Sequence, residues 1–115
     1  MELTSFTFVV DSPPRAKQRP RLGRRRKAFT PEATLIAEDI IAQAYVAAGG
    51  PLFEGPVTLT VVYSSKHQTI TIQNNEQPSK MRGDVDNYLK TTLDALNGLA
   101  YADDRQVTIL CGNKT

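Results

Sequence analysis

The segment from residue 83 to residue 106 contains a helix whose start and end can both be read from the sequence. Asp84 is a good N-terminal cap, and apolar residues then recur at steps of four, four and three positions, at Val85, Leu89, Leu93 and Leu96. Asn97 and Gly98 follow, and both residue types tolerate the left-handed turn that ends many helices. These signals predict a helix of about twelve residues with one buried apolar stripe.

The same segment holds five of the chain's twelve acidic residues and only two basic ones. Asp84 and Asp86 project from the first helical turn, and Lys90 lies one turn above Asp86 on the same face. Because such a helix spans only ~18 Å, the following loop can return the Asp103–Asp104 pair to the same place. Mg²⁺ takes one or two carboxylates, waters and phosphate oxygens as ligands, and a lysine offsets charge on phosphate. The spacing therefore suits divalent-cation chemistry on a phosphodiester.

A purely structural interpretation of these residues stays open. Lys90 is spaced to form ion pairs with Asp86 and Asp94, each worth roughly 0.2–0.5 kcal/mol on a helix surface. Asp103 and Asp104 are also common turn residues. In that case the segment is a solvated helix face followed by a turn.

Basic residues cluster in another part of the chain. Eight of the fourteen Lys and Arg residues lie between residues 15 and 27 with no acid among them, although the net charge is only +2. Such a cluster attracts a polyanion and binds phosphates with a steep salt dependence. The residues expected to contact DNA are Lys17, Arg19, Arg21, Arg24, Arg25, Arg26 and Lys27. The alternative is a disordered, solvated arm or a targeting patch.

The length and composition fit one soluble domain over residues 1–115. A chain of 115 residues with 40% hydrophobic content can bury a modest core. No apolar run approaches the ~18 residues that cross a bilayer, and the first residues lack the pattern of an export signal. Cys111 has no second cysteine to pair with, so a reducing cytoplasm is the expected compartment.

Strand and helix patterns divide the remaining sequence. Alternating residues predict strands at 3–10, 57–64, 69–72 and 106–111. In the first of these, Phe6, Phe8 and Val10 are expected to face inward. A basic loop at about 13–29 leads to a helix at about 31–48. We therefore expect an α+β fold, an α/β sandwich in which two helices cover a small mixed sheet.

An ordered set of motifs gives a resemblance to a known family. In chain order the motifs are Lys17-Gln18-Arg19-Pro20-Arg21, Phe29-Thr30-Pro31, Asp84-Val85-Asp86-Asn87, Lys90, Asp94-Ala95-Leu96-Asn97-Gly98 and Asp103-Asp104-Arg105-Gln106-Val107. Together they span roughly residues 14–107, and they closely resemble the RusA family of Holliday junction resolvases. The resemblance implies a RusA-like fold and a small dimeric, Mg²⁺-dependent endonuclease that nicks four-way DNA junctions symmetrically.

The resemblance also assigns roles to residues. It implies that Asp84, Asp86 and Asp104 are the metal carboxylates and that Lys90 is the essential lysine. It implies Mg²⁺ as cofactor, with Mn²⁺ as a substitute, and branched DNA and a second copy of the chain as partners. The implied setting is DNA recombination and repair at the bacterial nucleoid, for a host or phage enzyme. Family members usually continue past the last strand with a lysine-containing turn and one more strand, so a missing or shortened C-terminus is expected here.

Two other functions stay open from the sequence. One is a non-catalytic basic DNA-binding protein of a phage or mobile element, which would bind junctions without nicking them. The other is an interaction module in a phage or mobile-element replication complex, which would lack junction affinity at moderate salt.

Overall fold

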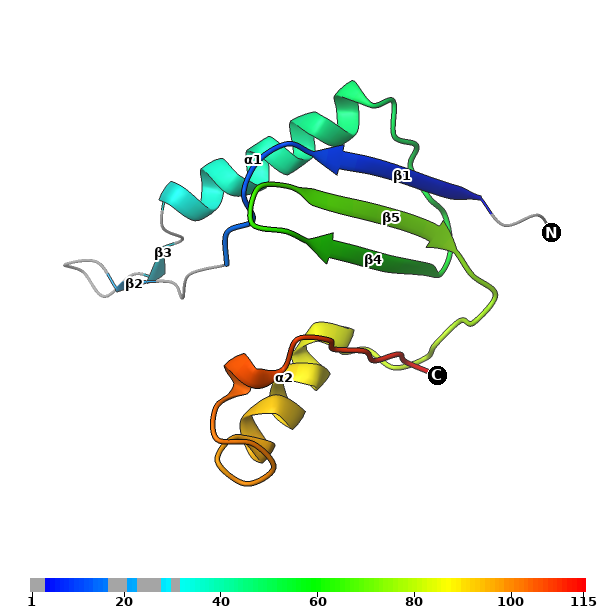
Figure 1. Ribbon diagram of the computed structural model, residues 1–115. Coiled ribbons are helices and arrows are strands. Elements are labelled where there is room, and N and C mark those ends of the chain that lie inside the picture. Colours follow the sequence, from blue (N-terminus) through cyan, green and yellow to red (C-terminus); the bar gives the residue numbers. More distant parts are fainter. Residues whose placement is uncertain (1–3, 17–20, 23–27, 30–31) are drawn as a thin grey trace. The chain divides into compact units, whose positions relative to one another are not determined.

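The computed structural model describes residues 4–16, 21–22, 28–29 and 32–115 (Figure 1). The chain divides into two compact units, Met1–Asn75 and Glu76–Thr115, and each is described by itself. The expectation of one domain over residues 1–115 stays a prediction. Within the described residues, no helix combines the length and apolar character needed to cross a membrane.

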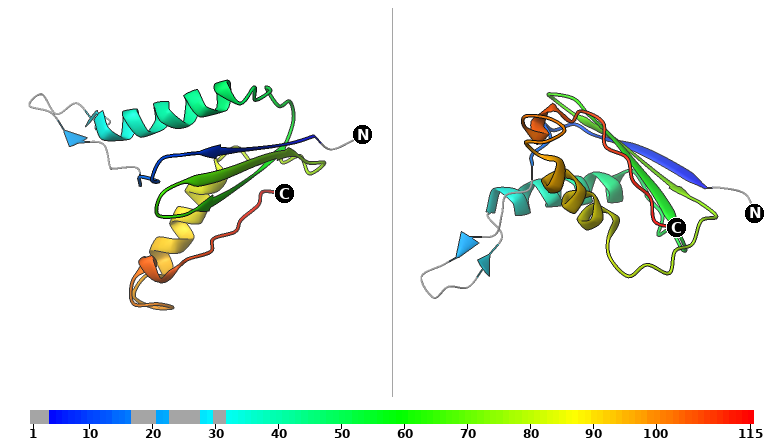
Figure 2. Two further views of the ribbon diagram at one scale, coloured as in Figure 1. Left: turned by 45° about the horizontal axis from the view of Figure 1, so that its top comes forward. Right: turned by 90° about the horizontal axis from the view of Figure 1, so that it is seen from below.

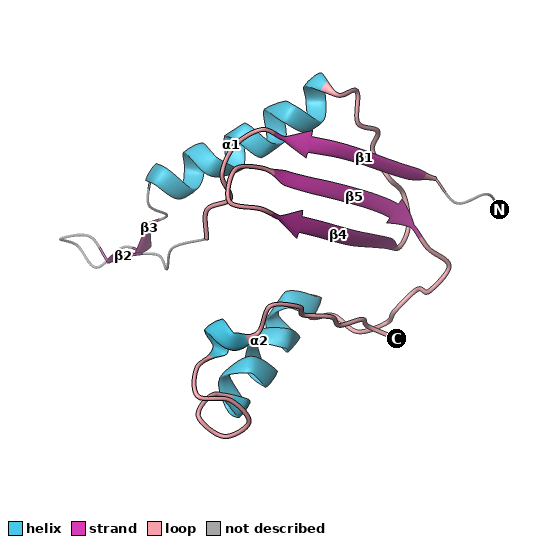
Figure 3. Ribbon diagram, in the orientation of Figure 1, coloured by secondary structure: helices cyan, strands magenta, loops and turns pink. Residues whose placement is uncertain are grey.

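The first unit contains a three-stranded sheet. Its strands are β1 (Ser5–Val10), β4 (Val57–Tyr63) and β5 (Gln68–Asn74), arranged in the order β1-β5-β4 (Figure 3). Both strand pairs are antiparallel, and the register aligns Phe8 and Val61 with Ile70 of the central strand. Side chains aligned across neighbouring strands point to the same face. Three apolar side chains, one from each strand, therefore form a row on one face of the sheet.

The helix α1 (Glu32–Ala47) lies along one face of this sheet, as the left view of Figure 2 shows. Phe8, Val10 and Ile70 are the buried hydrophobic centre, and partly buried side chains of α1 and the strands pack against them. Tyr45 of α1 contacts the rings of Phe6 and Phe8 edge to face, at centroid distances of 5.4 and 5.2 Å. The aromatic residues of β1 thus join helix and sheet.

A short ribbon interrupts the segment that was expected to be a loop. β2 (Arg21–Leu22) pairs antiparallel with β3 (Ala28–Phe29). The sequence-based interpretation missed this pairing because two-residue strands leave too few positions for an alternating pattern. Residues 23–27 fall between the two strands in sequence and lie outside the described residues.

The structure confirms the α+β class and the inward side of β1. Phe8 and Val10 are buried, and Phe6 packs against them. The described sheet differs from the expectation in being antiparallel rather than mixed. The strand expected at 69–72 is longer, at Gln68–Asn74, and is central. Pairing on both sides stabilises its Thr- and Gln-rich sequence as a strand, an effect of context that intrinsic preference does not capture.

The second unit is built on α2 (Val85–Leu96), followed by the 3₁₀ turn η1 (Asp104–Gln106). The helix has the expected bounds, and Gly98 takes the positive φ of 81° just beyond its end. Only a residue without a Cβ adopts this backbone angle without strain. The capping and periodicity signals therefore predicted this element correctly.

The strand expected at residues 106–111 does not form. All of unit Glu76–Thr115 is described, and it contains no strand with which these residues pair. Instead the C-terminal segment, residues 107–115, returns alongside α2 toward the start of the helix (Figures 1 and 2). A Cβ added at Gly112 would lie 2.7 Å from a side-chain carbon of Leu89, so the backbone lies directly on the helix. Residues 106–111 favour an extended backbone, but a β-strand in a sheet also needs a neighbouring strand with which to pair.

Replacing Val10 by alanine tests the position of the core. Val10 is 1% exposed and its neighbour Val9 is 56% exposed. We expect Val10→Ala to lower the free energy of unfolding by about 2 kcal/mol, because two buried methyl groups are removed and a cavity remains. Val9→Ala should change it by less than about 0.5 kcal/mol. Urea denaturation of both variants measures this, and equal losses would place the core elsewhere.

Candidate active site

The backbone of Asp84 caps α2, but the Asp84 carboxylate makes no capping hydrogen bond. Its carbonyl oxygen accepts hydrogen bonds from the backbone N–H groups of Asn87 and Tyr88, at 3.1 and 3.2 Å. Its φ and ψ angles of −78° and 142° are typical of a cap, yet the side chain makes no capping hydrogen bond. The residue is exposed. A cap usually uses its side-chain oxygen on the helix, whereas the Asp84 carboxylate has no hydrogen-bond partner among the described residues and is available for another ligand.

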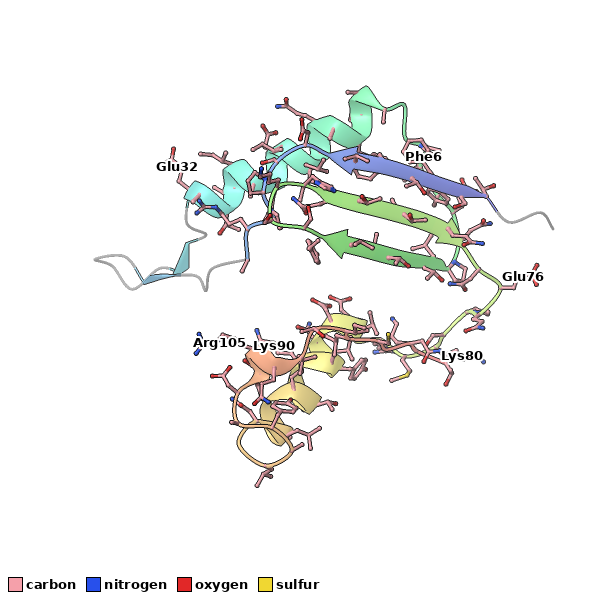
Figure 4. The ribbon with its side chains drawn as sticks, in the orientation of Figure 1. Phe6, Glu32, Glu76, Lys80, Lys90 and Arg105 are labelled. Carbon is pink, nitrogen blue, oxygen red and sulfur yellow. The ribbon has the colours of Figure 1, made fainter. Side chains whose placement is uncertain are left out.

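Asp86 and Lys90 are both exposed and lie one turn apart on α2. Figure 4 labels Lys90 on this helix. All the acids near Lys90 on this helix are described, and Lys90 forms a salt bridge with neither Asp86 nor Asp94. The pairs on which the structural interpretation relied are therefore not made. Within the described part of the chain neither Lys90 nor Asp86 has an ionic partner, so both side chains can face a charged ligand.

The turn η1 uses one of its two neighbouring acids for its own structure. Asp103 accepts a hydrogen bond from the backbone N–H of Arg105 at 2.9 Å, and Gln106 Oε1 accepts one from the backbone N–H of Asp103 at 3.1 Å. This is a capping box. The backbone N–H of Arg105 and then its guanidinium hold the pKa of the Asp103 carboxyl below its usual value. Asp104 is exposed and takes no part in the box, so it is the acid of this pair left for a ligand.

The sequence already contained a signal for this division of roles. Asp103 and Gln106 are separated by the spacing of a capping box, which places a short polar residue three positions before Gln or Glu. The spacing of the acids alone does not distinguish Asp103 from Asp104.

The structure does not gather the three expected metal carboxylates into one group. Among the described residues, no three His, Cys, Asp or Glu side chains come close enough to hold a metal ion together. Asp84 and Asp86 lie at the N-terminal end of α2, and Asp104 lies on η1. Two free carboxylates on one helical turn still fit Mg²⁺, which takes one or two carboxylates and completes its shell with water and phosphate. The assignment of the metal ligands stays a prediction.

A comparison with protein families identifies the family of this chain. The family model described as Endodeoxyribonuclease RusA matches residues 11–115. The chain belongs to the RusA family. Members of this family are endodeoxyribonucleases, enzymes that hydrolyse phosphodiester bonds within DNA strands. Comparisons with curated proteins and with solved structures find no match.

The RusA match extends across both units and includes every candidate site residue. It begins before the basic segment and runs through α2, η1 and the C-terminal segment. The resemblance seen in the sequence motifs is therefore confirmed at the level of the family. DNA as the substrate class follows from membership.

Most basic residues expected to contact DNA lie outside the part of the chain that the structure describes. Arg21 belongs to β2, and the other members of the set have no described position: Lys17, Arg19, Arg24, Arg25, Arg26 and Lys27. Their role in this RusA-family chain stays a prediction.

A hollow in the first unit has few described groups that could take part in catalysis. It has a volume of about 320 Å³ and lies between the chain after β1, the N-terminal half of α1 and Gln68 of β5. Among the described residues, its lining carries Arg15 but no acidic side chain. Its described lining contains no carboxylate, histidine or cysteine, the side chains that most often act as a general base or a metal ligand.

Sequence patterns assigned no role to Lys114, which the structure places beside the start of α2. Its ammonium group donates hydrogen bonds to the carbonyl oxygens of Met81 and Gly83, at 3.4 and 3.0 Å. A lone lysine 31 positions from Gly83 in sequence leaves no local signal. Only the folded arrangement of the C-terminal segment reveals the contact.

Proposed function

We propose that this RusA-family chain is a Mg²⁺-dependent endonuclease that resolves four-way DNA junctions by paired, symmetric nicks in recombination and repair. One observation supports the proposal most directly: the Asp84 carboxylate is exposed and makes no capping hydrogen bond, while hydrogen bonds from α2 hold the Asp84 backbone. Asp86 lies on the first turn of the same helix. The endodeoxyribonuclease family match over residues 11–115 supplies the substrate class.

Asp84 and Asp86 would hold the metal ion, and Asp104 would join them when DNA is bound. A divalent ion at such a site lowers the pKa of a water molecule and neutralises charge on the phosphate. The aspartates contribute hard oxygen ligands, which Mg²⁺ prefers and which Mn²⁺ also accepts. Holding the ligands on a helical turn fixes their positions before DNA arrives, so less ordering is needed during catalysis.

Lys90 would act on the substrate directly. Its ammonium group has no carboxylate partner among Asp86 and Asp94, so its charge is available to a phosphate. A lysine at this position stabilises negative charge on the phosphate or on the leaving oxygen. Because Lys90 and Asp86 share a helix face one turn apart, the charge and the metal ligand approach the same phosphodiester.

Binding of the DNA arms is assigned to the basic segment between residues 15 and 27. Its eight Lys and Arg residues carry no compensating acid, and they would hold the phosphate backbone against an acidic site that repels it. Cutting and binding thus belong to different parts of the chain. The expected setting is the bacterial cytoplasm, where chromosomal or phage DNA is the substrate.

Paired nicking implies that the working unit is a two-fold dimer. A four-way junction presents two symmetry-related strands, and each chain offers one set of candidate site residues. A closed dimer places a second set at a fixed distance, and this is the commonest oligomeric arrangement.

A non-catalytic DNA-binding protein is the second candidate function. It is favoured by the finding that, within the described residues, no three metal-ligating side chains are gathered. In this case the basic segment binds branched DNA, and the acids of α2 serve only solubility.

Titrating Mg²⁺ into a mixture of the protein with a synthetic four-way junction, beside a linear duplex of the same sequence, tests the proposal. We expect two symmetric nicks in the junction that depend on Mg²⁺ or Mn²⁺ and few nicks in the duplex. Tight junction binding without nicking at any metal concentration would support the second candidate instead. If the junction and the duplex were cut equally, the protein would be an endonuclease that does not select for junctions.

A further inference from the structure

The backbone of Gly83, which leads into Asp84, is held by Lys114 of the C-terminal segment and by Tyr88 of α2. Lys114 Nζ donates a hydrogen bond to the Gly83 carbonyl oxygen at 3.0 Å, and the Gly83 N–H donates one to Tyr88 Oη at 3.2 Å. Both polar backbone groups of Gly83 therefore have partners. The carbonyl of Gly83 shares its peptide plane with the nitrogen of Asp84, so this hydrogen bond fixes the backbone on which the Asp84 side chain stands.

Close packing of the C-terminal segment on α2 supports this contact. A Cβ at Gly83 would lie 2.6 Å from the Tyr88 ring, and one at Gly112 would lie 2.7 Å from Leu89, so glycine at both positions lets backbone approach the helix. Ser79 Oγ also donates to the Thr115 carbonyl oxygen at 3.3 Å. The segment before α2 and the end of the chain are thus joined at two places.

The ammonium group of Lys114 binds backbone rather than a carboxylate. Lys114 is partly buried, and among the described residues it forms no salt bridge. Its partners are the carbonyl oxygens of Met81 and Gly83, which flank Arg82. An ammonium has three donors and no acceptor, so it can join two carbonyls of one turn at once. A hydrogen bond from a charged donor is also stronger than a neutral one.

We propose that Lys114 is a positioning residue for the candidate metal site. It fixes the Gly83–Asp84 peptide from outside the helix, while α2 fixes the Asp84 carbonyl, and together they present the free carboxylate to a metal ion in one orientation. This inference rests on the proposed function, since it requires a metal ion at Asp84. Groups that hydrogen-bond directly to metal ligands typically contribute about 10- to 100-fold to metal affinity, and we expect the lower end of that range for Lys114, which holds the backbone of the ligand.

Mn²⁺ binding to the DNA-free protein, measured from the resonance signal of free Mn²⁺, tests the proposal without relying on cleavage. We expect Lys114→Met, which keeps the aliphatic stem and removes the donors, to weaken Mn²⁺ binding about tenfold or more. Lys114→Arg keeps the charge and the donors and should bind more tightly than Lys114→Met. Lys66→Met, the same change at an exposed lysine between β4 and β5, should leave the affinity unchanged.

The outcomes separate this inference from the proposed function. If the wild-type protein binds no Mn²⁺, both fail. If Asp84→Asn abolishes binding but Lys114→Met binds as tightly as wild type, the positioning role is overturned while the metal site stands, whatever happens to the melting temperature. Should Lys114→Met not fold, Lys114→Gln replaces it. The proposal then requires weaker binding by Lys114→Gln than by Lys114→Arg, and equal affinities would overturn it.

Discussion

Replacing Asp84 or Asp86 by asparagine is expected to lower the rate of junction nicking by roughly a thousandfold or more. A bound metal ion contributes several kcal/mol of transition-state stabilisation, and each ~1.4 kcal/mol changes the rate tenfold. Asparagine keeps the size of the side chain and removes the negative charge that holds the ion. Junction affinity should stay equal or rise, because one source of repulsion toward DNA is gone. Single-turnover cleavage and binding in the absence of metal measure the two effects separately.

Asp94→Asn provides the matched control for both variants. Asp94 lies on the same helix and is exposed, and it is not among the candidate ligands. It should nick junctions at close to the wild-type rate. Near-normal cutting by Asp84→Asn or Asp86→Asn would exclude that residue from the mechanism, and an equal loss in Asp94→Asn would indicate a general effect of charge on α2.

Neutralising Arg24, Arg25 and Arg26 together is expected to weaken junction binding and flatten its salt dependence. Each phosphate that the protein no longer neutralises removes ~0.9 from the slope of log K against log salt, so the slope should fall by up to about three units. The reason is that binding releases fewer counterions from DNA when fewer phosphates are neutralised. Binding titrations at several salt concentrations, with a metal-free buffer to prevent cutting, give the slope.

A variant at Lys66 controls for the change in net charge. Lys66 is exposed and lies outside the basic segment, so Lys66→Gln should leave the salt slope close to that of the wild-type protein. If the triple variant keeps the wild-type slope, this run of arginines is a solvated arm, and DNA contacts must come from other residues.

Local sequence signals were sufficient where a residue's environment is set by its near neighbours in the chain. The helix α2 begins after Asp84 and ends at Leu96, as the cap, the periodicity and Gly98 indicate. The inward side of β1 was likewise predicted from alternation, because successive strand residues point to opposite faces. Family membership was predicted too, from ordered motifs that span most of the sequence.

The sequence by itself thus determined the helix bounds, the inward face of β1 and the family to which the chain belongs. Tertiary structure alone decided that residues 106–111 form no strand and that Lys114 reaches Gly83. Helix capping and strand alternation act over a few residues, whereas these outcomes depend on which distant segment supplies a partner. A β-ladder, a lysine contact and a close glycine approach each need that partner in place.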